Sequence, residues 1–545
     1  MLNKHKNLSV SIGIFIIYLF ISYYWASHFF MMLLQNELRQ ISEDQLVFEF
    51  IGKEWALYGK IPFRDYFDHK GPVIYLFFAL GYLITKTSFG VLLLSALWTA
   101  ICMYITYKII CETSLFEKEI YNKILAFLLS LAFNLWFLYL IRACGITVGQ
   151  VSMPFILGCT WILALLYKND FNIKLRYHYI YGVLCALPVL SRATDAIFIF
   201  LAYICLWCVS IRKENIVQRL KEAGVTILGG LTPYSIFALY FAIHGAFKEF
   251  MDCTFFLNIK YATGNTVSMR TYGTLDGSND SIPGIVVLII ILFVAIRKIN
   301  NKEKFSKNTL IKLTALFICY ILQANLYVNS SRYIHYSTPL ICTLPLFFAA
   351  LLYDIRVKIK KQSIIVAISS LVMILTILML NSKSLYFINT IYKCGGITGC
   401  RLGYFTNENA EINNSLDNML KITHELDFNK VNNAINKAID RIKEKDEPYV
   451  VIQSSDILDK VMTENIKIPN CKYIVYQKWH IYVKVLTLDD FISNLDKNNI
   501  NTLYTIQTMY SDYFEIDPRY KKVDFYSFGV DKYPEIGVYV YNKEE

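Results

Sequence analysis

Charged residues are scarce in this chain. They make up 18% of its 545 residues, whereas 55% are hydrophobic and 15% are aromatic. Soluble proteins carry about 25% charged residues, so the composition alone predicts an integral membrane protein. The excess of 54 basic over 43 acidic residues is typical of Lys and Arg gathered in cytoplasmic loops. Nucleic acid is therefore not predicted as a partner.

The sequence also lacks the usual signs of a metal centre. Its 13 cysteines lie mostly in apolar runs, where cysteine behaves as a small hydrophobe. There is no CxxC pair and no His/Cys cluster with zinc spacing, so no metal or cofactor is predicted. The stretch "CGGITGC" contains Cys394 and Cys400, which could form a disulfide if this region faces an oxidising compartment. The sequence leaves that question open.

Long apolar runs divide the first two thirds of the chain. Residues 9–34 follow the basic "NKHKN", exceed the core of a signal peptide and lack an A-x-A site, which predicts a retained first span. Taken together, the apolar runs predict about eleven spans, near 9–31, 88–110, 123–141, 147–167, 178–191, 193–211, 224–243, 284–297, 312–328, 334–353 and 363–381.

The stretch 72–86, "PVIYLFFALGYLITK", decides the topology. It is shorter than the ~20 residues that a straight span needs. If it lies in the membrane interface, the basic segments "KNDFNIKLRYH", "IRKENIVQRLKEAG", "RKINNKEKFSKN" and "DIRVKIKKQ" all share the side of the N-terminus, as the positive-inside rule requires. We therefore predict a cytoplasmic N-terminus, with the loops 32–87 and 244–283 and the connections 142–149, 191–195 and 329–333 outside.

The residues after about 381 differ in composition and contain no apolar run of spanning length. Helical patterns occur at 412–424, 429–444, 455–464 and 488–497, and strand-like runs read "YVVIQS", "KYIVYQ", "LYTIQ", "VDFYSF" and "IGVYVYN". We expect two domains: a polytopic α-helical membrane domain over 1–381, with interfacial helices in its first outer loop, and a small extracytoplasmic α/β domain over 382–545.

The first outer loop has an internal order of its own. "SEDQ" is a capping box, and apolar residues then recur at helical spacing up to Gly59, a natural stop. This pattern predicts an amphipathic interfacial helix over 43–58 with Asp44 in its first turn. Gly71-Pro72 then opens a second short helix, with proline at the favoured first position.

A charged cluster separates these two helices, in "KIPFRDYFDHKGPVIY". Lys70 stands at the start of the second helix, where free N–H groups and the helix dipole favour an anion such as a phosphate. Asp44 begins the neighbouring helix and could face the same place. A carboxylate can take the proton of an acceptor hydroxyl while cations stabilise a departing phosphate. The alternative is a solvated loop whose surface ion pairs contribute little.

Residues 43–80, "EDQLVFEFIGKEWALYGKIPFRDYFDHKGPVIYLFFAL", resemble the first outer loop of GT-C membrane glycosyltransferases. The likeness is to their bacterial branch, which includes protein mannosyltransferases and lipid A aminoarabinose transferases. It implies that Asp44 is the catalytic acid-base residue and that Lys70 binds a lipid phosphate. Gly71 replaces a frequent proline of the family, and Gln45 replaces a glutamate, which leaves Glu43 as a rival for the acid. The remaining motif positions are taken as substrate-binding: Arg64, Asp65, Asp68 and His69.

Two shorter stretches carry a weaker resemblance to the same enzymes. "NSSRYIHYSTPL" contains Arg332 and His335 before a late span, and "LSRATDA" contains Arg192 where relatives often carry a basic residue. We predict that these three residues contact the donor. The alternatives are an ordinary aromatic belt for the first stretch and a simple pair of Arg192 with Asp195 for the second.

The resemblance and the residues together predict an inverting glycosyltransferase that uses a polyprenyl-phosphate sugar as donor. The acceptor would be a glycan, lipid or protein at the outer face of the bacterial cytoplasmic membrane, and membrane lipids would be further partners. The rival classes are a polysaccharide polymerase or ligase, whose large loop usually comes late in the chain, and a lipid-linked glycan flippase. A flippase predicts internal two-fold repetition, which is not found in this sequence.

Overall fold

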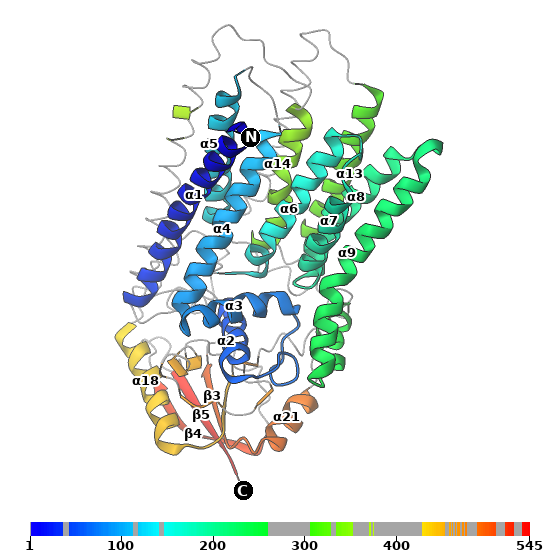
Figure 1. Cartoon of the computed structure of the whole chain (residues 1–545). Helices are drawn as coiled ribbons and strands as arrows, with labels where there is room; N and C mark the ends of the chain where they lie inside the picture. Colours follow the sequence, from blue (N-terminus) through cyan, green and yellow to red (C-terminus); the bar gives the residue numbers. More distant parts are fainter. Residues whose placement is uncertain are drawn as a thin grey trace.

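The computed structural model describes residues 2–35, 43–112, 118–140, 146–259, 306–328, 334–352, 370–371, 374, 428–452, 457–458, 460–461, 464, 466–468, 471–472, 475–476, 488–507, 518–527 and 537–544. Long helices form a bundle, and a small sheet with flanking helices lies against one end of it (Figure 1). The N-terminus lies at the other end of the bundle.

Seven described helices are long and apolar enough to cross a membrane. They belong to α1 (Leu2–Gln35), α4 (Ser88–Cys111), α5 (Glu119–Leu140), α6 (Val148–Lys168), η1 (Ala193–Ala196) with α8 (Ile197–Ser210), η2 (Lys213–Asn215) with α9 (Ile216–Ile243), and α13 (Lys307–Val328). Two further predicted spans coincide with shorter helices, α7 (Leu175–Val189) and the apolar α14 (Thr338–Leu352). The predicted span 284–297 lies outside the described residues, as does nearly all of 363–381.

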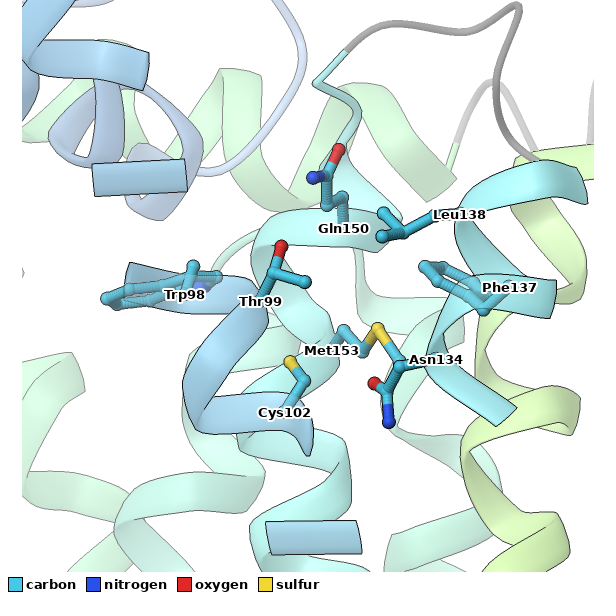
Figure 2. Close-up of a pocket in the computed structure, with 8 residues that line it drawn as sticks. All are labelled: Trp98, Thr99, Cys102, Asn134, Phe137, Leu138, Gln150 and Met153. Carbon is cyan, nitrogen blue, oxygen red and sulfur yellow. The ribbon is translucent and has the colours of Figure 1, made fainter. Parts of the chain in front are cut away.

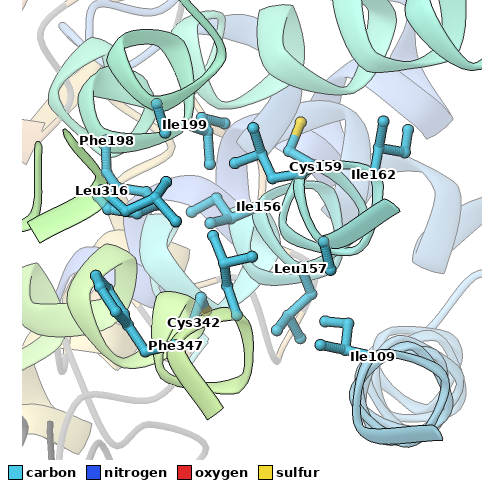
Figure 3. Packing of buried hydrophobic residues seen from close by; sticks show 14 of the residues in the cluster. Ile109, Ile156, Leu157, Cys159, Ile162, Phe198, Ile199, Leu316, Cys342 and Phe347 are labelled. Carbon is cyan, nitrogen blue, oxygen red and sulfur yellow. The ribbon is translucent and has the colours of Figure 1, made fainter. Parts of the chain in front are cut away.

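Helix α6 is the centre of the bundle. It begins where the Thr147 side chain accepts a hydrogen bond from the backbone N–H of Gln150 at 3.4 Å, a normal N-cap. The apolar stretch of α6 that could cross a membrane is 78% buried within the structure, whereas that of α1, at the margin of the bundle, is 17% buried. Figure 3 shows the surrounding core, in which apolar side chains of α4, α6, α8, α13 and α14 meet: Ile109, Ile156, Leu157, Cys159, Ile162, Phe198, Ile199, Leu316, Cys342 and Phe347.

Helices α2 (Glu43–Tyr58) and α3 (Pro72–Thr85) lie below the end of the bundle (Figure 1). They approach closely at Gly52, where an added Cβ would lie 2.5 Å from the Cβ of Phe78. Helix α3 is 14 residues long, too short for a straight span, and runs across the bundle end (Figure 1). Its Leu83 and Ile84 are exposed. As expected for 72–86, this helix is shorter than a span; its place in the membrane interface stays a prediction.

The described basic segments gather at the opposite end of the bundle. The Lys168 ammonium lies 2.9 Å from the Glu112 carboxylate, and Lys312 donates to the carbonyl of Tyr167 at 3.1 Å. These contacts join the end of α4, the end of α6 and the start of α13. The basic loop "DIRVKIKKQ" lies outside the described residues.

The C-terminal part is a mixed five-stranded sheet in the order β2-β1-β3-β5-β4. Strands β1 (Tyr449–Ile452), β2 (Val475–Tyr476) and β3 (Thr502–Gln507) are parallel, and β5 (Gly537–Lys543) pairs antiparallel with β3 and with β4 (Tyr520–Ser527). Helix α18 (Phe428–Lys445) covers one face, and α21 (Leu488–Lys497) leads into β3. Every strand-like run in the sequence contributes a strand. The predicted helix 412–424, the domain boundary near 382 and the pair Cys394–Cys400 lie outside the described residues.

This sheet domain is docked on the first outer loop. The backbone N–H of Phe67 donates to the carbonyl of Lys472 at 2.8 Å. Residues of α2, α3 and the sheet also belong to one continuous apolar cluster, which includes Phe50, Tyr66, Phe78, Val450, Leu503 and Tyr520. The charged motif of the loop therefore lies between the helical bundle and the sheet.

Candidate active site

The first part of the motif forms a tight turn after α2. Gly59 ends the helix with a φ of +67°, a conformation that glycine adopts without strain. The Asp65 carboxylate then accepts a hydrogen bond from the backbone N–H of Ile61 at 2.7 Å. Burial alone would raise the pKa of Asp65, but hydrogen bonds from Arg64 and Ile61 outweigh it and lower that pKa.

Arg64 pairs with Asp65 and also contacts the end of α9. The guanidinium of Arg64 forms two hydrogen bonds with the Asp65 carboxylate, both 2.9 Å long. A third, also 2.9 Å, goes to the carbonyl of His244 at the end of α9. These contacts tie the first outer loop to the loop after α9. The predicted role of the two residues in substrate binding stays a prediction.

Asp68, His69 and Lys70 form a chain of polar contacts. The Lys70 ammonium lies 2.6 Å from Nε2 of His69, and Nδ1 of His69 lies 3.1 Å from Oδ1 of Asp68. The hydroxyl of Tyr75, one turn into α3, donates to Oδ2 of Asp68 at 2.7 Å. Asp68 and His69 are buried, and Lys70 is half-buried. Tyr75 was not among the site residues predicted from the sequence.

The direction of proton donation follows from the ammonium. Because a protonated lysine can only donate, Nε2 of His69 accepts, which leaves the His69 proton on Nδ1, the nitrogen that lies 3.1 Å from Oδ1 of Asp68. Burial and the positive charge of Lys70 lower the pKa of His69, so the ring is neutral at pH 7. Burial would raise the pKa of Asp68, but the hydrogen bond and charge of its neighbours lower it below its usual range. The three residues thus carry one positive charge, on Lys70, and one negative charge, on Asp68.

The segment after α9 contacts the Asp68–His69–Lys70 group from the other side. Helix α10 (Phe247–Met251) runs into a π-helical turn, η3 (Asp252–Phe256), a rare form that often marks functional sites. The side chain of Asn258 donates to the carbonyl of His69 at 2.7 Å and to the carbonyls of Cys253 and Thr254. It therefore fixes the peptide that carries Lys70. No local sequence signal marks Asn258, because its partner lies 189 positions away.

The start of α3 differs from the prediction. The N–H of Gly71 donates to the carbonyl of Ser191 at 3.0 Å, and that of Val73 donates to the carbonyl of Leu190 at 3.2 Å. Pro72 has no N–H. The expectation of free amides for an anion is therefore wrong for Gly71 and Val73, since backbone carbonyls from a distant connection already accept their hydrogen bonds. These two amides do not contribute to an anion site, which gives the side-chain cations a larger part.

That same connection brings Arg192 to the site. The guanidinium of Arg192 lies 2.7 Å from the Asp195 carboxylate and 4.2 Å from the ring centre of Tyr336. The pairing of Arg192 with Asp195, left open by the sequence, is present, and the pair lies next to the start of α3.

The remaining predicted residues are placed less fully. Asp44 and its rival Glu43 lie in the first turn of α2, and their side chains are outside the described residues. Their neighbour Gln45 accepts a hydrogen bond from the N–H of Ile146 at 2.9 Å, so the start of α2 lies over the connection that leads into α6. His335 belongs to the short helix η5 (Ile334–Ser337), with its side chain outside the described residues, as is all of Arg332.

A small pocket opens between α4, α5 and α6 (Figure 2). Its walls combine apolar groups with two amides and a hydroxyl, from Trp98, Thr99, Cys102, Asn134, Phe137, Leu138, Gln150 and Met153. Its empty volume of about 230 Å³ includes the open solvent at its mouth. We assign it no substrate. Among the described residues there is no group of three or more potential metal ligands.

The chain is similar in structure, over nearly its full length, to two GT-C membrane glycosyltransferases. ArnT from Cupriavidus metallidurans is 12% identical; its structure bound to undecaprenyl phosphate has a TM-score of 0.46 over 98% of this chain and 97% of that one, and its apo structure a TM-score of 0.49 over 99% and 98%. The Archaeoglobus fulgidus oligosaccharyltransferase tethered to an acceptor peptide is 12% identical, with a TM-score of 0.42 over 91% of this chain and 69% of that one.

No protein-family model and no curated protein matches the sequence. The TM-scores lie below 0.5, so the likenesses describe the arrangement of the chain and lend no weight to a function. What the chain does has to be inferred from the motif and from the contacts around Lys70.

Proposed function

We propose that this protein is an inverting glycosyltransferase that takes a sugar from a polyprenyl-phosphate donor. The observation that carries the proposal is the position in which the Lys70 ammonium is held. A buried Asp68–His69 pair holds its ammonium at the start of α3, beside the connection that carries Arg192. Two cations at one end of a bundle of apolar helices suit a lipid phosphate, which is a small anion on an apolar chain.

In this mechanism the phosphate is both the anchor and the leaving group. Lys70 and Arg192 bind the phosphodiester of the donor and stabilise the second negative charge that forms when the bond from phosphate oxygen to the anomeric carbon breaks. The acceptor hydroxyl attacks from the opposite face of the sugar, which inverts the anomeric centre. Its proton passes to the Asp44 carboxylate.

Asp44 acts late in this reaction. A carboxylate in the first turn of a helix is stabilised as an anion by the helix dipole, which makes it a weak base. Proton transfer therefore follows most of the bond breaking, and the two cations supply the larger part of the rate enhancement. A polyprenyl phosphate leaves readily, so a weak base suffices.

The proposed setting is the outer face of a bacterial cytoplasmic membrane. The described basic segments lie at the bundle end away from α2 and α3, which by the positive-inside rule is the cytoplasmic end. The sheet domain would then lie outside, together with Lys70. The acceptor would be a surface glycan, lipid or protein, with the sheet domain close enough to the motif to contact it.

The experiment that tests this function compares surface glycans by mass spectrometry. A deletion strain should lack one sugar unit, and the wild-type gene should restore it. Asp44→Asn should fail to restore it at equal protein level, because the amide cannot take the proton. The matched control is the neighbouring Glu43→Gln, which should restore the unit. Restoration by Asp44→Asn at the wild-type level contradicts the proposed mechanism.

A further inference from the structure

The connection between α7 and α8 contains a buried carboxylate that the proposed reaction does not use. Asp195 is 1% exposed. Its Oδ1 accepts a hydrogen bond from Nε of Arg192 at 2.8 Å and lies 2.7 Å from Nη2. Among the described residues, its second oxygen, Oδ2, has no hydrogen-bond partner. Buried polar atoms of this kind are few in proteins and often occur where a function requires them.

Several elements fix the arginine that Asp195 contacts. The carboxylate holds one edge of the Arg192 guanidinium, and the ring of Tyr336 from η5 lies 4.2 Å from its centre. The Arg192 side chain is 12% exposed. The turn that carries Asp195 is itself held by Gln323 of α13, which donates to the carbonyl of Thr194 at 3.2 Å. The planar guanidinium therefore has a defined orientation.

The connection that carries Asp195 also contacts the backbone next to Lys70, the second cation of the site. The Gly71 N–H, next to Lys70, donates to the carbonyl of Ser191 in the same connection. The Asp195 carboxylate thus contacts one of the two cations that we assign to the donor phosphate, and its connection contacts the backbone next to the other.

We propose that Asp195 is a positioning residue of the donor-phosphate site, which acts by holding Arg192 toward the phosphate. This inference rests on the proposed function. It predicts a change in phosphate affinity opposite to the change expected from the charge of Asp195 alone. A carboxylate that acted only through its charge would repel a phosphate, so its removal would tighten binding. A carboxylate that orients Arg192 makes binding weaker when it is removed.

The chain contains a matched control for this test. Arg219 and Glu222 form another buried pair with the same spacing of three residues and the same separation of 2.7 Å. That pair lies at the other end of the bundle, where Arg219 donates to the carbonyl of Phe171. Asp195→Asn and Glu222→Gln therefore each remove the carboxylate charge from a buried pair with arginine, and only the first pair lies in the connection that meets the start of α3.

The experiment measures the affinity of the purified full-length protein for undecaprenyl phosphate by native mass spectrometry. Asp195→Asn should weaken binding about tenfold, as expected for loss of a charged hydrogen bond, and Glu222→Gln should leave it unchanged. Arg192→Ala should weaken binding, and the double variant with Asp195→Asn should bind no more weakly than Arg192→Ala alone. Tyr336→Leu removes the other support of Arg192 without changing charge, and should also weaken binding.

The outcomes separate this inference from the function on which it rests. Unchanged or tighter binding by Asp195→Asn, or effects of Asp195 and Arg192 that multiply, overturns the role of Asp195 alone. If Asp195→Asn does not yield folded protein, Tyr336→Leu decides in its place, and wild-type affinity in that variant overturns the inference. Absence of undecaprenyl phosphate binding by the wild-type protein overturns the proposed function and this inference together.

Discussion

At the scale of single residues, the site depends on a histidine that must stay neutral. Nε2 of His69 can accept from Lys70 only while it carries no proton. The ring is buried between a carboxylate and an ammonium, and burial together with Lys70 lowers its pKa below the ordinary value of 6.5. The Lys70 ammonium therefore keeps its orientation at neutral pH and loses its partner in acid.

This arrangement predicts a specific dependence of stability on pH. Since the folded pKa of His69 is lowered, its contribution to the free energy of unfolding is complete above pH 6.5. The contribution is lost as the pH falls below 6.5 toward the folded pKa, with a slope of at most about 1.4 kcal/mol per pH unit. His69→Gln should be less stable at pH 7.5 but should lose less on acidification, measured as the thermal unfolding midpoint between pH 7.5 and 5.5.

The control for this prediction is the exposed His244. His244→Gln should keep the full acid-dependent loss of the wild-type protein. If His69→Gln and the wild-type protein lose the same stability between pH 7.5 and 5.5, His69 is not the group that titrates, and the assignment of its neutral form is wrong.

At the scale of elements, the close approach of α3 to the α7–α8 connection sets up the site. An added Cβ at Gly71 would lie 1.9 Å from the carbonyl oxygen of Leu190, so only glycine allows the two backbones to meet. The contact explains how Arg192 and Lys70, 122 positions apart in the sequence (192 − 70), come to lie together.

Gly71→Ala should therefore destabilise the protein. Forcing a methyl group against this backbone costs about 1–3 kcal/mol, seen as a lower thermal unfolding midpoint in detergent. The matched variant is Gly224→Ala in α9, where an added Cβ meets nothing within 4 Å. It should be neutral or more stable by up to about 1 kcal/mol, because alanine favours the helix. Equal effects of the two substitutions would refute the close contact at Gly71.

The helices around the motif could largely be predicted from the sequence. The capping box, the apolar periodicity and Gly59 predicted the helix at 43–58, and Gly71-Pro72 predicted the start of α3, because these signals act within a few residues. The occupied amides at that start could not be predicted, since their partners, Leu190 and Ser191, are distant in the sequence. The hydrogen bond from Asn258 to the carbonyl of His69 could not be predicted for the same reason.

At the scale of the whole molecule, the sheet domain supports the motif. Phe67 donates to Lys472, and Asn494 of α21 holds the Lys472 segment by accepting from its N–H at 3.2 Å. The alternating strand patterns predicted the sheet, but nothing in them indicated which surface it would contact. A docking surface depends on two segments together, and here they are about 400 positions apart.

Loosening the Lys472 segment should therefore expose the motif. Asn494→Ala removes its hydrogen bond to Lys472, and we expect faster hydrogen–deuterium exchange in peptides covering residues 62–71, measured by mass spectrometry. Asn498→Ala changes the same helix end, where Asn498 donates to the carbonyl of Asn494, but leaves the contact with Lys472. It should not change exchange at 62–71. Equal exchange in both variants would show that the sheet domain does not order the motif.

The measurement that tests the central claim most directly is the affinity of one lysine variant for undecaprenyl phosphate. Lys70→Ala should bind this lipid about 10–100-fold more weakly than the wild-type protein, as expected for loss of a charged contact. Lys248→Ala, which removes an exposed lysine from the loop after α9, should bind within about twofold of wild type. Wild-type affinity in the Lys70→Ala protein would contradict a lipid-phosphate site at the start of α3.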